Sequence, residues 1–300
     1  MKKNECPLCY NHIDEKYIVD KVNHIWKSSK DIYQCRDCDL YFIEEPSNKE
    51  IEALYKSDFY NKNSSFIYSY IEKKIKYARA LNRYNYIKKF IEENKKINIL
   101  EIGASDGTLL NFFKKDNHNV LGYELNNDAR EKAKKIFNIT MKEDFLKADE
   151  NEKYDIIIMS HILEHFVDPR SIIKHIHSML NDNGLLYIEI PSTPNHNNFN
   201  EMGILFETEH TLHFNISSIS KLIKDENFNI VEILYNEYNS KENVKRNICL
   251  GVLSINAIYG FLDFFIKIIF NPKKAFIDYN INKKEYFSIG QNIRLIAKKK

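Results

Sequence analysis

The sequence lacks an excess of charge of either sign. Its 300 residues include 44 Lys and Arg against 42 Asp and Glu, which gives a net charge of +2. So small a charge provides no strong field to hold a polyanion such as RNA, because nucleic-acid binding depends largely on contacts between cations and phosphates. We therefore expect no extended phosphate-binding face, and a nucleic-acid partner is disfavoured.

Long hydrophobic runs without charges are also absent. The N-terminal stretch MKKNECPLCY has two lysines and no apolar run behind them, so we predict no secretory signal and a cytoplasmic protein. The apolar stretch 248–270 contains Asp263 and Lys267, and two charges in so short a run argue against a membrane span. We predict an apolar helical insertion at about 247–276 that packs on the core or in a homodimer, with peripheral membrane contact as the alternative.

Cysteines are few, and four of the five fall into two pairs. The pairs Cys6/Cys9 and Cys35/Cys38 form a CxxC…CxxC set with 25 residues between them. Disulfides are not expected in a reducing compartment, whereas four thiolates suit a tetrahedral zinc ion without an open position for catalysis. We predict a small N-terminal zinc ribbon with a structural ion; the alternative is two pairs of buried thiols. Cys249 has no partner in this pattern and is expected in the core.

Short β-branched runs alternate with helical segments from residue 97 onward, which indicates βαβ units and a mostly parallel sheet. We therefore divide the chain into residues 1–60, the zinc-binding module with its connector, and residues 61–300, an α/β domain. Ligands of such sheets bind at the carboxyl ends of the strands. We predict strands at 97–102, 119–124, 139–141, 154–160, 185–190, 228–235 and 292–297, helices at 107–115, 128–137 and 169–180, and one or two further helices within 66–93.

The turn after the first of these strands has one glycine too few for a dinucleotide. The segment reads Gly103-Ala-Ser-Asp-Gly107, and Ser105 stands where the GxGxxG pattern has its second glycine. That glycine lets the backbone approach a pyrophosphate, so its absence disfavours a nicotinamide or flavin dinucleotide. A nucleoside without phosphates does not need it.

Acidic residues lie at the places from which a nucleoside is bound. Glu124 ends the second strand, where an acid binds ribose hydroxyls, and Glu101 precedes the glycine turn. Asp144 and Phe145 follow the third strand and offer a carboxylate and an aromatic face to adenine. Together they predict a pocket for S-adenosylmethionine, whose cationic sulfonium suits acids and which carries no phosphate. The residues assigned to the cofactor are Glu101, Gly103, Ser105, Asp106, Gly107, Glu124, Leu125, Asp144, Phe145, Ser160 and His161.

The ordered combination of ExGxxxG, an acid after the second strand and SHILEHFVDP after the fourth resembles the class I S-adenosylmethionine-dependent methyltransferases, from about residue 97 to the end. That resemblance implies a Rossmann-like seven-stranded sheet. The zinc module before it resembles that of bacterial sugar methyltransferases, including C-methyltransferases of nucleotide-linked deoxysugars, and implies a role in surface polysaccharide or deoxysugar biosynthesis. In those enzymes a Tyr-His-Glu-His cluster carries out proton transfer to or from the substrate. Here only Glu209 and His210 match it, which leaves O-methylation at least as plausible as C-methylation.

Methyl transfer to a hydroxyl requires an aligned acceptor and a base. The reaction is an in-line displacement, and histidine is the natural base near neutral pH. We predict that His210 is the base, that His165 faces the substrate, and that Glu209 orients an imidazole or binds a hydroxyl. His161 and His213 are further candidates at the same sheet edge. The alternative for His165 is that it caps or packs its own loop.

Two other functions compete with sugar methylation. Some ribosomal RNA methyltransferases also begin with a four-ligand zinc module, so an rRNA or tRNA methyltransferase is the first alternative. The near-neutral charge disfavours it. The second is a non-catalytic adaptor whose zinc ribbon binds a partner protein, and the intact glycine and acid positions disfavour that.

Overall fold

The computed structural model describes residues 5–13, 18–22, 30–43, 66–192, 210–237 and 291–300. The chain divides into two compact units, of which one comprises 1–62, 80–235 and 292–300 and the other 63–79 and 236–291. The predicted insertion at 247–276 and its apolar stretch 248–270 lie outside the described residues. Within the described ranges, no helix combines the length and the apolar character needed to cross a bilayer.

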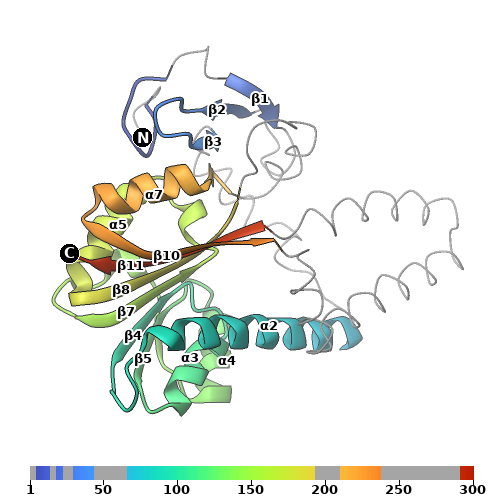
Figure 1. Cartoon of the computed structure of the whole chain (residues 1–300). Coiled ribbons are helices and arrows are strands. Elements are labelled where there is room, and N and C mark those ends of the chain that lie inside the picture. The colour runs from blue at the N-terminus through green and yellow to red at the C-terminus, as the bar shows by residue number, and fades with distance from the viewer. Residues whose placement is uncertain (1–4, 14–17, 23–29, 44–65, 193–209, 238–290) are drawn as a thin grey trace, which may run out of the picture. The chain divides into compact units, whose positions relative to one another are not determined.

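A seven-stranded sheet forms the centre of the first unit, as predicted (Figure 1). Its order is β10-β11-β8-β7-β4-β5-β6. The pairs from β6 through β5, β4 and β7 to β8 are parallel, and β11 runs antiparallel to β8. The strands are β4 (Asn98–Ile102), β5 (Asn119–Tyr123), β6 (Met141–Lys142), β7 (Tyr154–Ser160), β8 (Leu180–Pro191), β10 (Phe228–Glu237) and β11 (Gln291–Lys299).

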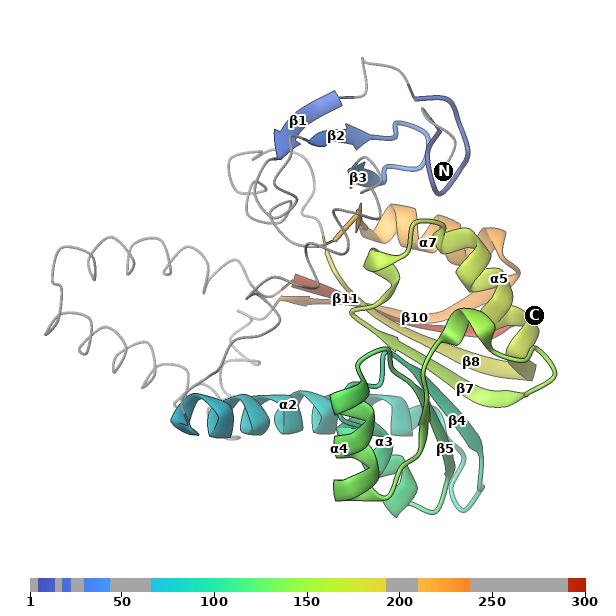
Figure 2. The same cartoon turned by 180° about the vertical axis from the view of Figure 1, so that it is seen from behind.

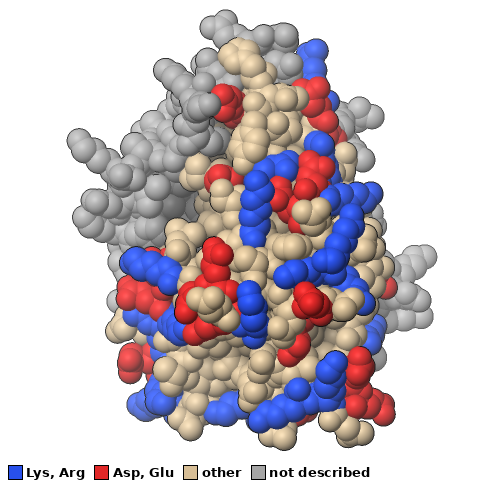
Figure 3. Space-filling view, turned by 90° about the vertical axis from the view of Figure 1, so that its left-hand side faces the viewer, with Lys and Arg blue, Asp and Glu red and all other residues tan. Residues whose placement is uncertain are grey.

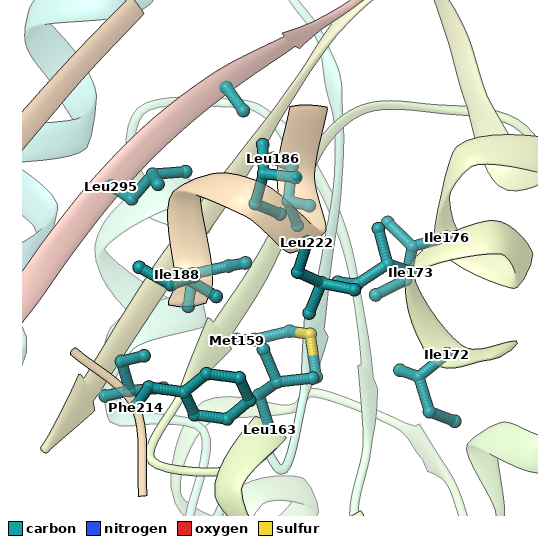
Figure 4. Close-up of a cluster of buried hydrophobic side chains, with 14 of the residues drawn as sticks. Met159, Leu163, Ile172, Ile173, Ile176, Leu186, Ile188, Phe214, Leu222 and Leu295 are labelled. Atoms are coloured by element: carbon teal, nitrogen blue, oxygen red, sulfur yellow. The ribbon is translucent and has the colours of Figure 1, made fainter. Parts of the chain in front are cut away.

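Helices cover both faces of this sheet because successive strand residues point to opposite faces. Ile99 and Ile158 are buried in a cluster with residues of α2 (Phe66–Ile87), α3 (Thr108–Lys115) and α4 (Asn127–Phe137). Ile102, Ile157 and Met159 belong to the opposite cluster, with α5 (Pro169–Met179) and α7 (Ile216–Asp225). Figure 2 shows these two helices, and Figure 4 shows Met159 near Ile173 and Leu222. Burial of each of these isoleucines stabilises the fold by about 1.5–3 kcal/mol. The two clusters therefore determine which residues of each strand point to which face of the sheet.

Three of the helices have a side-chain cap at their N-terminus. The Asn126 side chain accepts from the Ala129 amide at α4, and Asp168 accepts from the Ser171 amide at α5. Asn215 forms a capping box at α7, a helix that we did not predict. Each such cap contributes about 1 kcal/mol.

The N-terminal module is an antiparallel sheet that a strand from the second half of the chain completes. Its strands are β1 (Ile18–Val22), β2 (Lys30–Gln34), β3 (Tyr41–Ile43) and β9 (Leu212–His213), in that order. The register pairs Tyr41 with His213. Asn215 Nδ2 donates to the backbone oxygen of Asp39 at 2.9 Å and to its Oδ2 at 2.8 Å, and Arg170 Nε donates to the backbone oxygen of Leu8 at 2.8 Å. The module is therefore joined directly to the segment that follows His210.

Candidate active site

The glycine turn after β4 has the conformation that its glycines permit. Gly103 and Gly107 have φ of 70° and 76°, in the left-handed region, and Ser105 lies there too with φ of 49°. A Cβ atom on Gly103 would lie 2.2 Å from Cδ1 of Ile162. The loop that follows β7 therefore packs directly on the turn that follows β4, which brings the predicted cofactor and substrate residues to one edge of the sheet.

Two predicted cofactor residues also hold this turn in place. Oε2 of Glu124 accepts from the Ser105 amide at 2.8 Å, and Oε1 accepts from the Asn126 amide at 2.9 Å. Oδ1 of Asp106 accepts from the amide and the hydroxyl of Thr108 at 3.2 and 2.6 Å. A carboxylate has about four acceptor positions, so each acid keeps capacity for a ligand hydroxyl. The neighbouring Leu125 is 66% exposed.

Glu101 is a buried acid without a full set of partners. It is 5% exposed, and its Oε2 accepts no hydrogen bond from the residues described by the structure. Burial raises the pKa of Glu101 to about 8; Arg83 opposes the rise, whereas Asp106 and Glu124 add to it. An orphaned buried carboxyl group beside two further acids matches a cationic ligand, as a sulfonium cofactor requires.

Asp144 and Phe145 differ in what they can offer to adenine. The Asp144 carboxylate accepts from the Leu146 amide at 3.0 Å and lies 3.1 Å from Nζ of Lys147. Phe145 is 5% exposed, and its ring packs edge-on against Tyr123 and against His175, with ring centroids 5.6 and 4.9 Å away. The ring is a core residue rather than an open aromatic face.

His161 lies between two buried carboxylates at the end of β7. Its φ of 55° is unusual for a residue with a side chain. Its Nδ1 lies 3.6 Å from Oε1 of Glu164, and its Nε2 lies 3.4 Å from Oε1 of Glu189. Burial lowers the pKa of His161, but these two acids outweigh it and raise the pKa above its ordinary value. The preceding Ser160 hydroxyl is buried and has no hydrogen-bond partner in the described part of the chain.

A second group of side chains lies beside His161 and consists of Glu164, His165 and His210. The first two lie in the short helix η4 (Leu163–His165), and one potential ligand atom from each of the three side chains lies within 4.8 Å of the others. Glu164 is 1% exposed, and neither of its oxygens accepts a hydrogen bond from any described residue. Nε2 of His210 is 3.8 Å from Oε1 of Glu164, and the His165 and His210 ring centroids are 4.8 Å apart.

The electrostatic surroundings of His210 bear on its predicted role. Burial, with smaller effects of His165, His213 and His161, lowers the pKa of His210 to about 2. General bases work best with a pKa near the operating pH, so direct proton removal by His210 is disfavoured by its surroundings. The ring of His213 lies 6.3 Å from that of His210. Glu209, the third predicted catalytic residue, lies outside the described residues.

Sequence reasoning missed Glu164 and Glu189. Glu189 is 2% exposed and binds Arg83 through two hydrogen bonds, at 3.2 and 2.9 Å, and Arg294 through one, at 2.8 Å. Burial raises the pKa of Glu189, but His161 and the two arginines outweigh it and hold the pKa well below its ordinary value. The spacing in HILEH could have indicated Glu164, because it lies between two histidines already assigned to the site. No local signal joins Glu189 to arginines more than a hundred residues away.

The four predicted thiols form a compact cluster. Their sulfur atoms lie within 4.8 Å of one another, with two pairs at 3.5 Å, Cys6 with Cys38 and Cys9 with Cys35. Each CxxC turn is followed by a residue in the left-handed region, Tyr10 with φ of 60° and Asp39 with φ of 61°. Zinc–sulfur bonds of about 2.3 Å in a tetrahedron place the sulfurs roughly 3.8 Å apart, so the donor set and its spacing fit a zinc ion.

Comparison with solved structures places the fold among methyltransferases. Coclaurine N-methyltransferase bound to N-methylheliamine and SAH superposes with a TM-score of 0.51 at 14% identity, over 73% of this chain and 72% of that one. Magnesium protoporphyrin IX methyltransferase of Synechocystis PCC 6803 with bound SAH gives 0.51 at 12% identity, over 85% and 100%. Phosphoethanolamine N-methyltransferase 2 of Haemonchus contortus, in complex with S-adenosylhomocysteine, gives 0.54 at 15% identity, over 73% and 52%. At these identities the likeness shows a shared fold.

The sequence itself also matches a family. No curated protein sequence matches the chain. The family described as "Methyltransferase domain" matches residues 72–233, which is more than half of the chain. This span contains the glycine turn, Glu124 and the HILEH loop. The chain therefore belongs to this methyltransferase family and is a class I S-adenosylmethionine-dependent methyltransferase.

Proposed function

We propose that the protein transfers the methyl group of S-adenosylmethionine to a hydroxyl of a sugar or nucleotide-linked sugar in surface polysaccharide or deoxysugar biosynthesis. One observation carries the proposal: the Glu164 carboxylate is buried, lacks hydrogen bonds from described residues, and lies beside the imidazoles of His161, His165 and His210. A carboxylate accepts from hydroxyls, and imidazoles donate to or accept from them, so the cluster suits a polyhydroxylated acceptor.

The cofactor is proposed to lie over the glycine turn. Glu124 would accept from the ribose hydroxyls, and Glu101 would face the cationic end, where its Oε2 has no hydrogen-bond partner among the described residues. When bound, S-adenosylmethionine provides the electrophilic methyl group. Ile162 packs on Gly103, so the loop that carries Glu164 and His165 lies next to the turn. This contact supports the close alignment that an in-line displacement requires.

The four-cysteine cluster is proposed to hold a structural zinc ion. Four sulfur donors leave no open position, so the ion has no direct role in the reaction. Its proposed effect on the site is structural: it orders the N-terminal module. The module contains β3, which pairs with β9, and β9 begins two residues after His210. A zinc-bound module would therefore hold His210 in place. The thiols also suit a reducing compartment, which supports the expected cytoplasmic location.

A small acceptor is favoured over nucleic acid. Figure 3 shows Lys and Arg side chains interspersed with Asp and Glu over the face that it displays. On this face the mixed charges give no continuous positive track for phosphates, in keeping with the net charge of +2. A homodimer or membrane contact through 248–270 stays a prediction.

The direct test is to incubate the purified protein with S-adenosylmethionine and a panel of nucleotide-linked sugars, and to search by mass spectrometry for one added methylene. We expect a product with the wild type and none with His210→Ala, which should still bind S-adenosylmethionine in calorimetry. Glu124→Ala should lose binding and turnover together. A product on RNA alone, or unchanged turnover in His210→Ala, would contradict the proposal.

A further inference from the structure

We propose that Glu164, His165 and His210 bind a divalent transition-metal ion, of which zinc is the first candidate, separate from the four-cysteine cluster. The three side chains come from two segments, η4 and the residue before Thr211, and their potential ligand atoms lie within 4.8 Å of one another. One carboxylate and two imidazoles leave coordination positions open for a substrate oxygen, as catalytic zinc sites do.

The state of Glu164 is the strongest argument for an ion. Its side chain is nearly inaccessible to solvent, and both oxygens lack hydrogen bonds from the described residues. Burying a carboxylate without hydrogen bonds is costly, and buried charges are found paired or bound to metals. The imidazole atoms of His161 and His210 approach its Oε1 only to 3.6 and 3.8 Å, beyond hydrogen-bond distance. A dication bound by the carboxylate would balance its buried negative charge.

The spacing also fits a bound ion. Zinc binds imidazole nitrogen and carboxylate oxygen at about 2.0–2.2 Å, so two ligand atoms on one tetrahedral ion lie roughly 3.3–3.6 Å apart. The distance of 3.8 Å between Nε2 of His210 and Oε1 of Glu164 is close to this range. The amide of Thr211 donates to the backbone oxygen of Glu164 at 3.1 Å, which fixes the two ligand-bearing segments to each other. Nε2 of His161 lies 3.4 Å from Oε1 of Glu189, and His161 does not belong to this ligand set.

The consequence for catalysis rests on the proposed function. If bound by Glu164, His165 and His210, the ion would act as a Lewis acid that makes it easier for an acceptor hydroxyl to lose its proton to solvent. The oxygen lone pair then forms a bond to the methyl carbon while the carbon–sulfur bond breaks and its electron pair goes to sulfur. The products are the methyl ether, S-adenosylhomocysteine and one proton. His210 would thus act as a ligand rather than as the base.

Metal counting tests the site without reference to activity. The full-length protein is dialysed against zinc sulfate, washed free of excess metal and analysed by plasma mass spectrometry. We expect two zinc ions per wild-type chain and one in His165→Ala and in Glu164→Gln. His165 is exposed, so its variant should fold even if Glu164→Gln does not. Glu150→Gln is the matched control, because Glu150 lies 3.1 Å from the imidazole of His175 and the described residues add no third ligand there, so this variant should keep both ions.

One zinc ion in the wild type, or two in His165→Ala, would overturn the inference. The two proposals can fail separately. If the second ion is present but no sugar is methylated, the ion site stands and the acceptor is wrong. If a sugar is methylated by protein that holds one zinc ion, the acceptor stands and the second site does not exist.

Discussion

Glu101 gives the sharpest prediction on cofactor binding. Burial raises its pKa to about 8, so at pH 7 only about one tenth of the chains carry it ionised. If the bound sulfonium requires the carboxylate, each pH unit below 8 should weaken S-adenosylmethionine binding about tenfold, or about 1.4 kcal/mol. Between pH 5.5 and 7 the association constant should therefore rise roughly 30-fold. The α-amino group of the cofactor stays protonated over this range.

Isothermal titration calorimetry at four pH values measures this slope, and Glu101→Gln is the control. The variant should bind more weakly at pH 7 and show little dependence on pH. The same carboxyl group makes the free energy of unfolding depend on pH in the opposite direction to cofactor binding. Its folded pKa lies above the ordinary value of 4.5, so the protein without cofactor should lose stability as pH rises from 4.5 to 8, by at most about 1.4 kcal/mol per unit. A flat wild-type binding profile, or equal slopes in wild type and variant, would refute the reasoning.

Three further predictions concern the framework of the site. Gly103→Ala should lower the free energy of unfolding by about 1–3 kcal/mol in urea titrations and weaken cofactor binding, because its Cβ would meet Ile162. Glu189→Gln leaves the buried Arg83 without its carboxylate and should cost about 3–5 kcal/mol by the same assay. Chelation of zinc, or Cys38→Ser, should lower the thermal midpoint by more than about 5 °C; an unchanged midpoint in scanning calorimetry would argue against a structural ion.

The sheet was predictable because each strand is a short apolar, β-branched run that can be recognised in the local sequence. The predicted strand 154–160 has the same bounds as β7, whereas β8 begins at Leu180, five residues before its predicted start, and the βαβ rules fix the parallel direction of both. The glycine turn followed from the same logic, since a strand-to-helix turn needs residues that tolerate positive φ. Helix α7 was missed although its signals are present. Asn215 is a good cap, and Ile219, Leu222 and Ile223 have helical spacing.

The candidate site was predicted only in part, for physical reasons. Local sequence placed Glu124 and the histidines at one edge of the sheet. It did not show that Glu164 would be buried without hydrogen bonds from the other described residues, because burial depends on contacts across the fold. It also gave no sign that β9 would pair with β3, since a two-residue strand has no periodicity to detect. The pKa of His210 depends on burial and on histidines from two segments of the chain that are distant in sequence, so spacing alone could not reveal it.

The most direct test of the account is a crystal soaked with equal amounts of S-adenosylmethionine and NAD. The account predicts S-adenosylmethionine over the glycine turn, with its ribose hydroxyls at Glu124 and its sulfonium toward Glu101. Electron density for NAD at Gly103, with no S-adenosylmethionine bound, would contradict it.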